Sequence, residues 1–395
     1  MKHTLTTSIF KVGLLSMFMV MVSCSEDDNS MMPDDMGGND DDDEMVEGRR
    51  AELYVTNNDN GDITKFDITN DTQLTIGTSS TAAEGIYYDA SEDLVIQASR
   101  SNNWLESFDV TDLLDVDLSL DISFNGDADL ESPRELAVYG DYYVVADNGS
   151  NRFFVYQKTG TMFSLQTTVD VPFPVWGITF KGGDLYAVVD ISSDLAVYYN
   201  FLDKAMDGTM YPDKRVTIEG IVRTHGLTYS GSDDVMVMTD IGDAANTDDD
   251  GGFHIINDFS LKFDALSDGD VLTTDNQIRV AGSSTLMGNP IDVAYDSETD
   301  VVYVSDIGTS KVLGFSSIGS GGNIAPTFNV DLTAASSIYF SSDETDGDMG
   351  DSSEMGMTQL YTTSTANGNV VVYDLMNGTS KTIITGSATS EGIYY

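Results

Sequence analysis

The sequence of 395 residues predicts an all-β fold in which seven four-stranded blades close into a ring. Three observations lead to this prediction. From residue 51 onward, short alternating runs rich in Val, Ile, Tyr and Phe recur between Gly, Asp and Asn turns, which is the pattern of β-strands. One short motif repeats seven times along this region. The chain also ends on a copy of that motif that no further strand follows.

The repeated motif begins with a small or acidic residue, continues with an aliphatic residue and has an aromatic or aliphatic residue two positions later. Successive copies lie roughly 42 to 66 residues apart, which is in the range of one four-stranded blade. We therefore expect each copy to form the inner strand of a blade. The copies begin at Gly85, Glu135, Gly177, Gly226, Asp292, Ser337 and Gly392.

A second strand and a polar turn follow most copies of the motif. Five of these second strands end on an acid or amide, at Asn57, Asp147, Asp190, Asp240 and Asp306. A catalytic role would be expected at one position and not at five. The repetition favours a structural role in which these side chains accept hydrogen bonds from the backbone of the turn.

The strand order at the two ends of this region predicts the number of blades. Residues 51–76 begin with a second strand, so their blade lacks an inner strand. Residues 390–395 form an isolated inner strand that repeats the sequence of residues 84–88. We expect this C-terminal strand to pair with residues 53–57 and complete the N-terminal blade. Such a closure gives seven blades and removes the exposed sheet edges.

The N-terminus predicts a secreted, lipid-anchored protein. Residues 1–23 have a weakly positive start and an apolar run that is too short to span a bilayer comfortably. The run ends in Val20-Met21-Val22-Ser23-Cys24, which resembles the bacterial lipobox, and Cys24 is the single cysteine of the chain. The resemblance implies cleavage before Cys24 and its acylation. The alternative is a free thiol behind a spanning helix.

Residues 24–50 are expected to form an acidic, disordered tether. They include the run Asp40-Asp41-Asp42-Asp43-Glu44, and such blocks of like charge repel one another and stay extended. The acidic residues Glu26, Asp27 and Asp28 directly behind the cysteine resemble the surface-export signal of Bacteroidota lipoproteins. This resemblance implies an outer-membrane lipoprotein exposed at the cell surface, and the alternative is a plain tether. Residues 51–395 form the folded domain in this scheme.

The charge of the chain excludes two classes of partner. Lys and Arg number 18 against 66 Asp and Glu, a formal net charge of −48. Nucleic acid binding needs clustered basic residues for phosphate contacts, so a nucleic acid partner is not expected. Electrostatic docking on an anionic membrane face is also excluded, and the membrane contact is expected to run through the lipid.

The strand pattern resembles the YVTN and NHL-type β-propeller repeats. The first of these motifs is present in Tyr54-Val55-Thr56-Asn57, and the resemblance covers residues 51–395. It implies a seven-bladed β-propeller with a central channel. The motif is informative about architecture and does not imply a particular activity.

The residue before each inner-strand motif is expected to lie at the mouth of the central channel. A set with two carboxylates, an arginine, a tryptophan and a histidine is more varied than packing needs, so we predict a ligand site there. Carboxylates and imidazole are also metal ligands. The alternative is a set of polar groups that pair with each other around a water-filled channel. The positions are Glu84, Arg134, Trp176, His225, Ile291, Ser336 and Glu391.

A second candidate site lies in the insertion at residues 242–252. Asn246, Asp248 and Asp250 precede Gly251 and match the first half of a calcium-binding loop, with oxygen ligands at alternate positions. The glutamate expected at the twelfth position is replaced by Asn257. The alternative to Ca²⁺ binding is an acidic turn exposed to solvent.

The sequence favours a binding or scaffolding module for a protein, glycan or envelope ligand, with no chemistry of its own. Nucleophilic catalysis lacks support, because His225 and His254 are the only histidines after the signal segment and no Gly-x-Ser-x-Gly motif occurs. The alternative is a metal-dependent hydrolase or lactonase at the channel mouth. It rests on a local resemblance of Glu84-Gly85 and Glu391-Gly392 to the gluconolactonase and senescence-marker propellers, whose equivalent glutamate binds the metal.

Overall fold

The computed structural model describes residues 50–342, except 112, 114 and 115, together with the strands at 359–363, 370–374 and 379–383. Predictions made for Cys24, for the acidic tether and for Glu391 concern residues outside this part of the chain. No helix in the described residues is long and apolar enough to cross a membrane.

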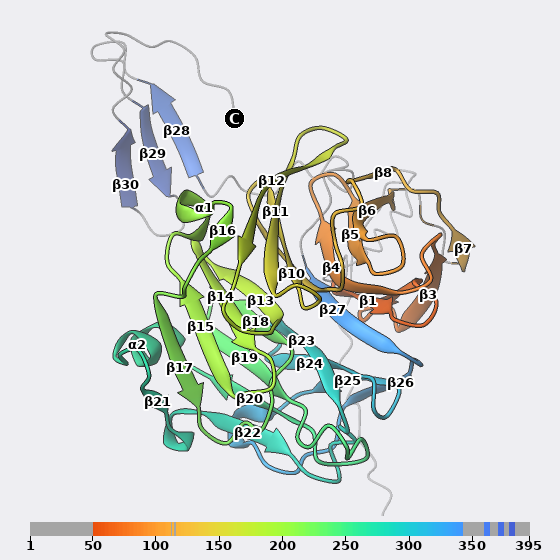
Figure 1. Cartoon of the computed structure of the whole chain (residues 1–395), viewed down its shortest axis with the longest axis vertical. Coiled ribbons are helices and arrows are strands. Elements are labelled where there is room, and N and C mark those ends of the chain that lie inside the picture. Colours follow the sequence, from red (N-terminus) through yellow and green to blue (C-terminus); the bar gives the residue numbers. More distant parts are fainter. Residues whose placement is uncertain are drawn as a thin grey trace, which may run out of the picture. The chain divides into compact units, whose positions relative to one another are not determined.

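The described chain forms a β-propeller of six four-stranded antiparallel blades, which we number I to VI along the chain (Figure 1). Blade I contains β27 (Ala335–Ser341), β1 (Glu52–Asn57), β2 (Ile63–Asp67) and β3 (Thr72–Gly77). Blade II contains β4 (Ala83–Asp89), β5 (Leu94–Ser99), β6 (Trp104–Asp109) and β8 (Phe124–Asn125). Blade III contains β9 (Pro133–Tyr139), β10 (Tyr142–Asp147), β11 (Arg152–Lys158) and β12 (Phe163–Asp170).

The other three blades repeat this order from the inner to the outer strand. Blade IV contains β13 (Val175–Lys181), β14 (Asp184–Val189), β15 (Asp194–Tyr198) and β17 (Lys214–Ile218). Blade V contains β18 (Leu227–Ser230), β19 (Val235–Asp240), β20 (Gly252–Ile256) and β22 (Ile278–Ala281). Blade VI contains β23 (Pro290–Asp296), β24 (Val301–Asp306), β25 (Lys311–Phe315) and β26 (Phe328–Asp331).

Short elements decorate the blades. Two-residue strands extend the outer edges of blades I, III and IV, at β7 (Leu118–Ser119), β16 (Gly208–Thr209) and β21 (Val271–Leu272). The helices are α1 (Phe201–Lys204), α2 (Phe259–Asp264), η1 (Thr274–Asn276) and η2 (Ile318–Ser320). A separate three-stranded sheet contains β28 (Gln359–Thr363), β29 (Val370–Asp374) and β30 (Thr379–Ile383).

The ring is closed by β27, which is the inner strand of blade I and pairs antiparallel with β1. In this register Leu53 lies opposite Phe340 and Val55 lies opposite Ile338. A later strand does complete the N-terminal blade, as predicted. The strand that pairs with β1 is β27, so the predicted pairing of β1 with residues 391–395 is wrong, and so is the count of seven blades. The motif copy at Ser337, for which the sequence predicts a separate blade, lies in β27 and belongs to the N-terminal blade. Inner-strand sequences resemble one another, so the sequence alone does not say which copy returns to β1.

The six inner strands contact one another in a closed cycle. Each of β4, β9, β13, β18, β23 and β27 contacts the inner strand before it and the one after it. Apolar side chains on both faces of each blade are buried against the neighbouring blades, as in the cluster that joins Phe153 of blade III to Val175 and Tyr198 of blade IV. The core therefore lies between the blades, and the inner strands are left to line a central channel.

The acids that end the second strands mostly serve the backbone, as predicted. Asp147 accepts hydrogen bonds from the N–H groups of residues 131, 132 and 149, at 2.8 to 2.9 Å. Asp240 and Asp306 each accept three N–H groups in the same way, and Asn57 accepts two. These contacts tie the turn after the second strand to the chain that enters the inner strand. Asp190 accepts the N–H of Ile191 at 2.7 Å and differs from the others because it also binds side chains at the channel mouth.

Candidate functional site

The inner strands converge so closely that two of them need glycine. A Cβ atom on Gly177 would lie 2.3 Å from the carbonyl oxygen of His225, and one on Gly226 would lie 2.5 Å from the Cα of Asp292. The N–H of Gly177 donates to that same carbonyl oxygen at 2.9 Å. This contact between blades IV and V fixes the side chains of the preceding positions, Trp176 and His225, next to each other.

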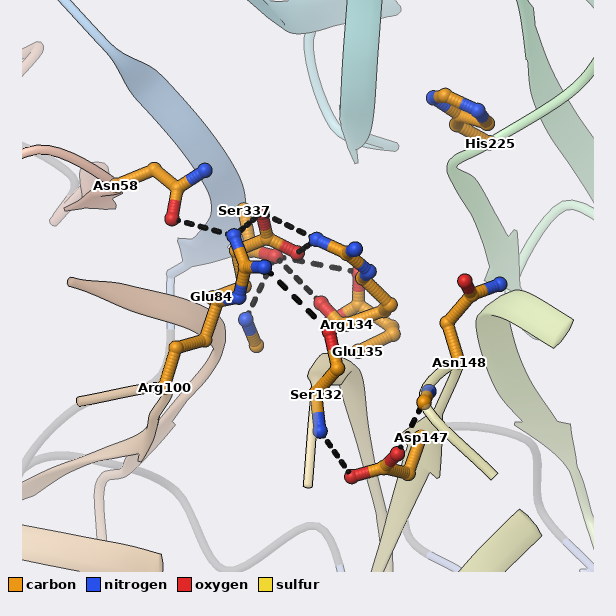
Figure 2. Close-up of polar contacts among 12 residues, drawn as sticks. Asn58, Glu84, Arg100, Ser132, Arg134, Glu135, Asp147, Asn148, His225 and Ser337 are labelled. Atoms are coloured by element: carbon orange, nitrogen blue, oxygen red, sulfur yellow. Dashed lines mark hydrogen bonds and ion pairs between the residues drawn. The ribbon is translucent and has the colours of Figure 1, made fainter. Parts of the chain in front are cut away.

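Glu84 is the centre of a buried ion cluster at the mouth (Figure 2). Nη1 of Arg134 lies 3.1 Å from each carboxylate oxygen of Glu84, and Nη1 of Arg100 lies 3.2 Å from Oε1. Asn58 accepts a further hydrogen bond from Arg100 at 2.8 Å. Burial raises the pKa of Glu84 above its ordinary value, and the two arginines act in the opposite direction. The carboxylate is therefore the counter-ion of two guanidinium groups from blades II and III.

Three flat side chains from blades III, IV and V are layered beside this cluster. The guanidinium of Arg134 lies 4.2 Å from the centre of the Trp176 ring, and the imidazole of His225 stacks on the same ring at 3.8 Å with an interplanar angle of 4°. Two groups at such distances cannot share one face, so they cover opposite faces of the indole. Cation–π attraction and stacking fix Arg134 in place against Trp176, which is half-buried.

Asp190 holds the far side of this stack. It accepts hydrogen bonds from Nε and Nη2 of Arg223 at 2.9 and 2.7 Å, and its Oδ1 lies 3.4 Å from Nε2 of His225. Burial alone would raise the pKa of Asp190, but the contacts with His225 and Arg223 outweigh it and lower the pKa to about 2. Burial lowers the pKa of His225, so the imidazole is neutral at neutral pH.

A pair of acids closes the channel one position deeper than the mouth. Glu135 of blade III and Asp292 of blade VI are both buried and are hydrogen-bonded to each other across the ring. Asp292 also accepts the N–H of Ile338 at 2.9 Å. Burial and the neighbouring acid raise the pKa of Glu135 well above its ordinary value, and burial also raises the pKa of Asp292, to about 7. The pair links opposite blades and separates the mouth from the channel behind it.

The channel behind the acid pair contains a cavity of about 180 Å³. Its walls come from the later residues of the inner strands, including Ile86, Ala137 and Ile178, and the acid pair also lines it. Ser337 connects this level to the mouth, because its hydroxyl accepts the N–H of Gly85 at 2.7 Å and lies 3.3 Å from the carbonyl oxygen of Arg134 (Figure 2).

The structure brings four of the predicted mouth residues into one connected group, namely Glu84, Arg134, Trp176 and His225. Ile291 and Ser336 occupy the equivalent positions of blades VI and I and are buried. Sequence reasoning missed Arg100, Asp190, Arg223, Glu135 and Asp292. Glu135 and Asp292 had a visible signal, because they are the acidic members of a motif position that is otherwise Gly or Ser. In a six-bladed ring they come from opposite blades.

The candidate calcium loop is fixed by internal hydrogen bonds. Oδ1 of Asn246 accepts the N–H of Asp248 at 3.2 Å, and Oδ2 of Asp250 accepts the N–H of Asp243 at 2.8 Å. Within the part of the chain that the structure describes, no group of three or more His, Cys, Asp or Glu side chains could hold a metal ion. Calcium binding at residues 246, 248 and 250 stays a prediction.

Comparisons with known proteins support the fold. No family model matches the sequence, and no curated protein matches it either. A chain in the crystal structure of the nidogen/laminin complex is similar, with a TM-score of 0.51 and 14% identity over 73% of this chain and 98% of that one. A "putative 6-phosphogluconolactonase" of Bacteroides fragilis is similar, with a TM-score of 0.50 and 10% identity over 74% of this chain and 98% of that one. At such identities the likeness extends to the propeller fold alone.

Proposed function

We propose that this chain is a binding propeller that takes its ligand at the channel mouth. The observation that carries the proposal is the stack of Arg134, Trp176 and His225, which Glu84 and Asp190 fix at its two sides. Nε of Arg134 and Nδ1 of His225 are buried and have no hydrogen-bond partner in the described residues. Buried polar groups are normally paired, so such atoms are expected where a ligand completes the site.

The distribution of arginine supports this proposal. The chain has eight arginines and a net charge of −48, yet Arg100, Arg134 and Arg223 gather at one end of the channel. Burying charged groups costs free energy, and apolar side chains would pack the same place at lower cost. A mouth that holds fixed guanidinium groups is therefore better explained by recognition than by packing. A protein, a glycan or another envelope component is the proposed ligand.

The alternative function, a metal-dependent hydrolase or lactonase, would need the Glu84 carboxylate as a metal ligand. Both of its oxygens accept hydrogen bonds from Arg134, and Oε1 also accepts one from Arg100. A divalent cation at this carboxylate would be repelled by two guanidinium groups a few ångströms away. These contacts favour binding over metal catalysis at the mouth.

Metal analysis of the purified protein tests the two functions against each other. We expect less than stoichiometric metal, and no stabilisation by Ca²⁺ or Zn²⁺ that depends on Glu84, because the arginines already occupy its carboxylate. Thermal melts of the parent and of Glu84→Gln with and without each cation provide the measurement. A stoichiometric metal that is lost in Glu84→Gln would support the enzyme and contradict the binding proposal.

We also propose that the propeller is displayed on the outer surface of the cell by a lipid on Cys24. The support is the lipobox-like segment and the acidic residues that follow it. Acyl chains insert into the membrane in place of a spanning helix. We expect Cys24→Ser to abolish labelling by a radioactive fatty acid and to leave unprocessed precursor. Normal labelling and membrane retention of that variant would show that the anchor lies elsewhere, and Ser25→Ala serves as the matched control.

A further inference from the structure

Arg134 has an unused recognition edge. Nε and Nη2 form one side of a guanidinium group and can donate two parallel hydrogen bonds to a carboxylate. Arg223 and Arg215 use this edge on Asp190 and Asp194, where Nε and Nη2 both lie 2.6 to 2.9 Å from a single carboxylate oxygen. Arg134 binds Glu84 through Nη1, and its Nε has no acceptor in the described chain. Arg215 and Arg223 thus bind a carboxylate through their Nε and Nη2 edge, whereas the Nε of Arg134 has no such partner among the described residues of the mouth.

At the level of the mouth, two guanidinium groups have one carboxylate between them. Arg100 and Arg134 share the single carboxylate of Glu84. The nearby carboxylate of Asp147 is turned to backbone N–H groups of blade III. His225 is neutral at neutral pH, because its burial lowers its pKa. The carboxylate of a ligand at this level would give Arg134 a counter-ion that it does not share with Arg100.

An apolar rim lies beyond the other end of the stack. Ile191 follows Asp190 and is 70% exposed, and Val222 precedes Arg223 and is 64% exposed. Ile191 has a φ of 64°, a left-handed conformation that a β-branched residue adopts only under strain. The fold therefore holds a strained aliphatic side chain in solvent beside the mouth. Exposed aliphatic groups at such a place are suited to contact an apolar part of a ligand.

We propose that the mouth binds an elongated aliphatic carboxylate, whose carboxylate pairs with the Nε and Nη2 edge of Arg134 while its aliphatic part lies on Ile191 and Val222. This inference rests on the proposed binding function and names the class of its ligand. The stack of Trp176 and His225 separates the two ends. The ligand must therefore span on the order of 10 Å, or roughly three residues of extended chain. A short fatty acid and the C-terminus of a peptide share this chemistry.

The fluorescence of Trp176 reports binding directly. The chain has two tryptophans, so Trp104→Phe in the full chain leaves Trp176 as the single reporter. The probes are octanoate and the tripeptide Leu-Ala-Ala, each compared with its neutral amide. We expect at least one acid to change the emission with a Kd at least tenfold lower than that of its amide, because a neutral amide oxygen accepts weaker hydrogen bonds from a guanidinium group than an ionised carboxylate does. Binding of octanoate alone would indicate a lipid source, and binding of the tripeptide acid a peptide source.

Three variants locate the two contacts. Arg134→Lys keeps the charge but loses the forked edge, and we expect it to raise the Kd of the acid about tenfold. Val222→Asp changes an exposed residue and is not expected to disturb folding. It should raise the Kd of the acid, because it removes the aliphatic contact and adds a negative charge. Arg215→Lys alters the same type of edge on the outer strand of blade IV and should leave the Kd unchanged.

Equal affinities for acid and amide would overturn the carboxylate assignment. A Kd that Arg134→Lys and Val222→Asp both leave unchanged would overturn the placement of the ligand. Either result leaves the binding function itself standing, because the amide or another ligand would still be seen at Trp176. The binding function fails separately, through a stoichiometric metal that depends on Glu84.

Discussion

Replacing Ile338 by Asp is expected to destabilise the ring by about 5 kcal/mol, from the lost apolar contacts and the burial of an unpaired acid. Ile338 is 5% exposed, lies opposite Val55 and packs in one cluster with Leu53 and Ala335. Because β27 is the strand that closes the ring, the loss falls on the contact between the first and last blades. The melting temperature should fall by roughly 10 °C or more.

Ile393→Asp is the matched control, since Ile393 has the same place in the last copy of the motif. The role of closing strand is taken by β27, so we expect Ile393→Asp to change the melting temperature by no more than a few degrees. Ile338→Val should cost only about 1 kcal/mol, because it keeps an aliphatic side chain at the position. A large effect of Ile393→Asp with a small effect of Ile338→Asp would show that the C-terminal strand closes the ring after all.

The architecture could be predicted from the sequence because every blade repeats the same local pattern. Alternation of apolar and polar residues and the polar turns sufficed to place the inner and second strands, such as β9 and β10, at their observed positions. The number of blades depends on which distant strands pair, and a local sequence pattern does not contain this information. Ile338 and Ile393 stand in equivalent sequence contexts, and the choice between them is made by long-range pairing with β1, for which no local signal exists.

The sequence predicts the residues of the candidate site whose place follows from their position on an inner strand. It does not predict the residues that reach the site only through the direction of their side chains. Trp176 and His225 precede equivalent motif copies, so their neighbourhood follows from the repeat. Arg100 and Arg223 reach the mouth from a turn after a second strand and from the segment before an inner strand. Asp190 has the same sequence context as Asn57, Asp147, Asp240 and Asp306, and only the contacts of its side chain distinguish it.

The second large effect is expected at Glu84. Glu84→Ala leaves Arg100 and Arg134 at the mouth without their shared counter-ion, and breaking a buried ion pair in this way typically costs about 3–5 kcal/mol. We expect a fall of roughly 10 °C in the melting temperature. Glu84→Gln should lower the free energy of unfolding by less than Glu84→Ala does, because the amide oxygen of the glutamine still accepts a hydrogen bond. A loss within about 0.5 kcal/mol for Glu84→Ala would be typical of an unpaired surface acid and would contradict a buried cluster.

The free energy of unfolding of the double variant Glu84→Ala with Arg134→Met shows directly whether Glu84 organises the arginines of the mouth. If Glu84 is the counter-ion that fixes the arginines of the mouth, removing Arg134 as well removes part of the uncompensated charge. The double variant should then be more stable than the sum of the two single losses predicts, by about 1 kcal/mol or more. Denaturant titrations of the parent, the two single variants and the double variant give this coupling. Losses that simply add would mean that Glu84 does not act through Arg134 and that the arginine mouth is not organised around it.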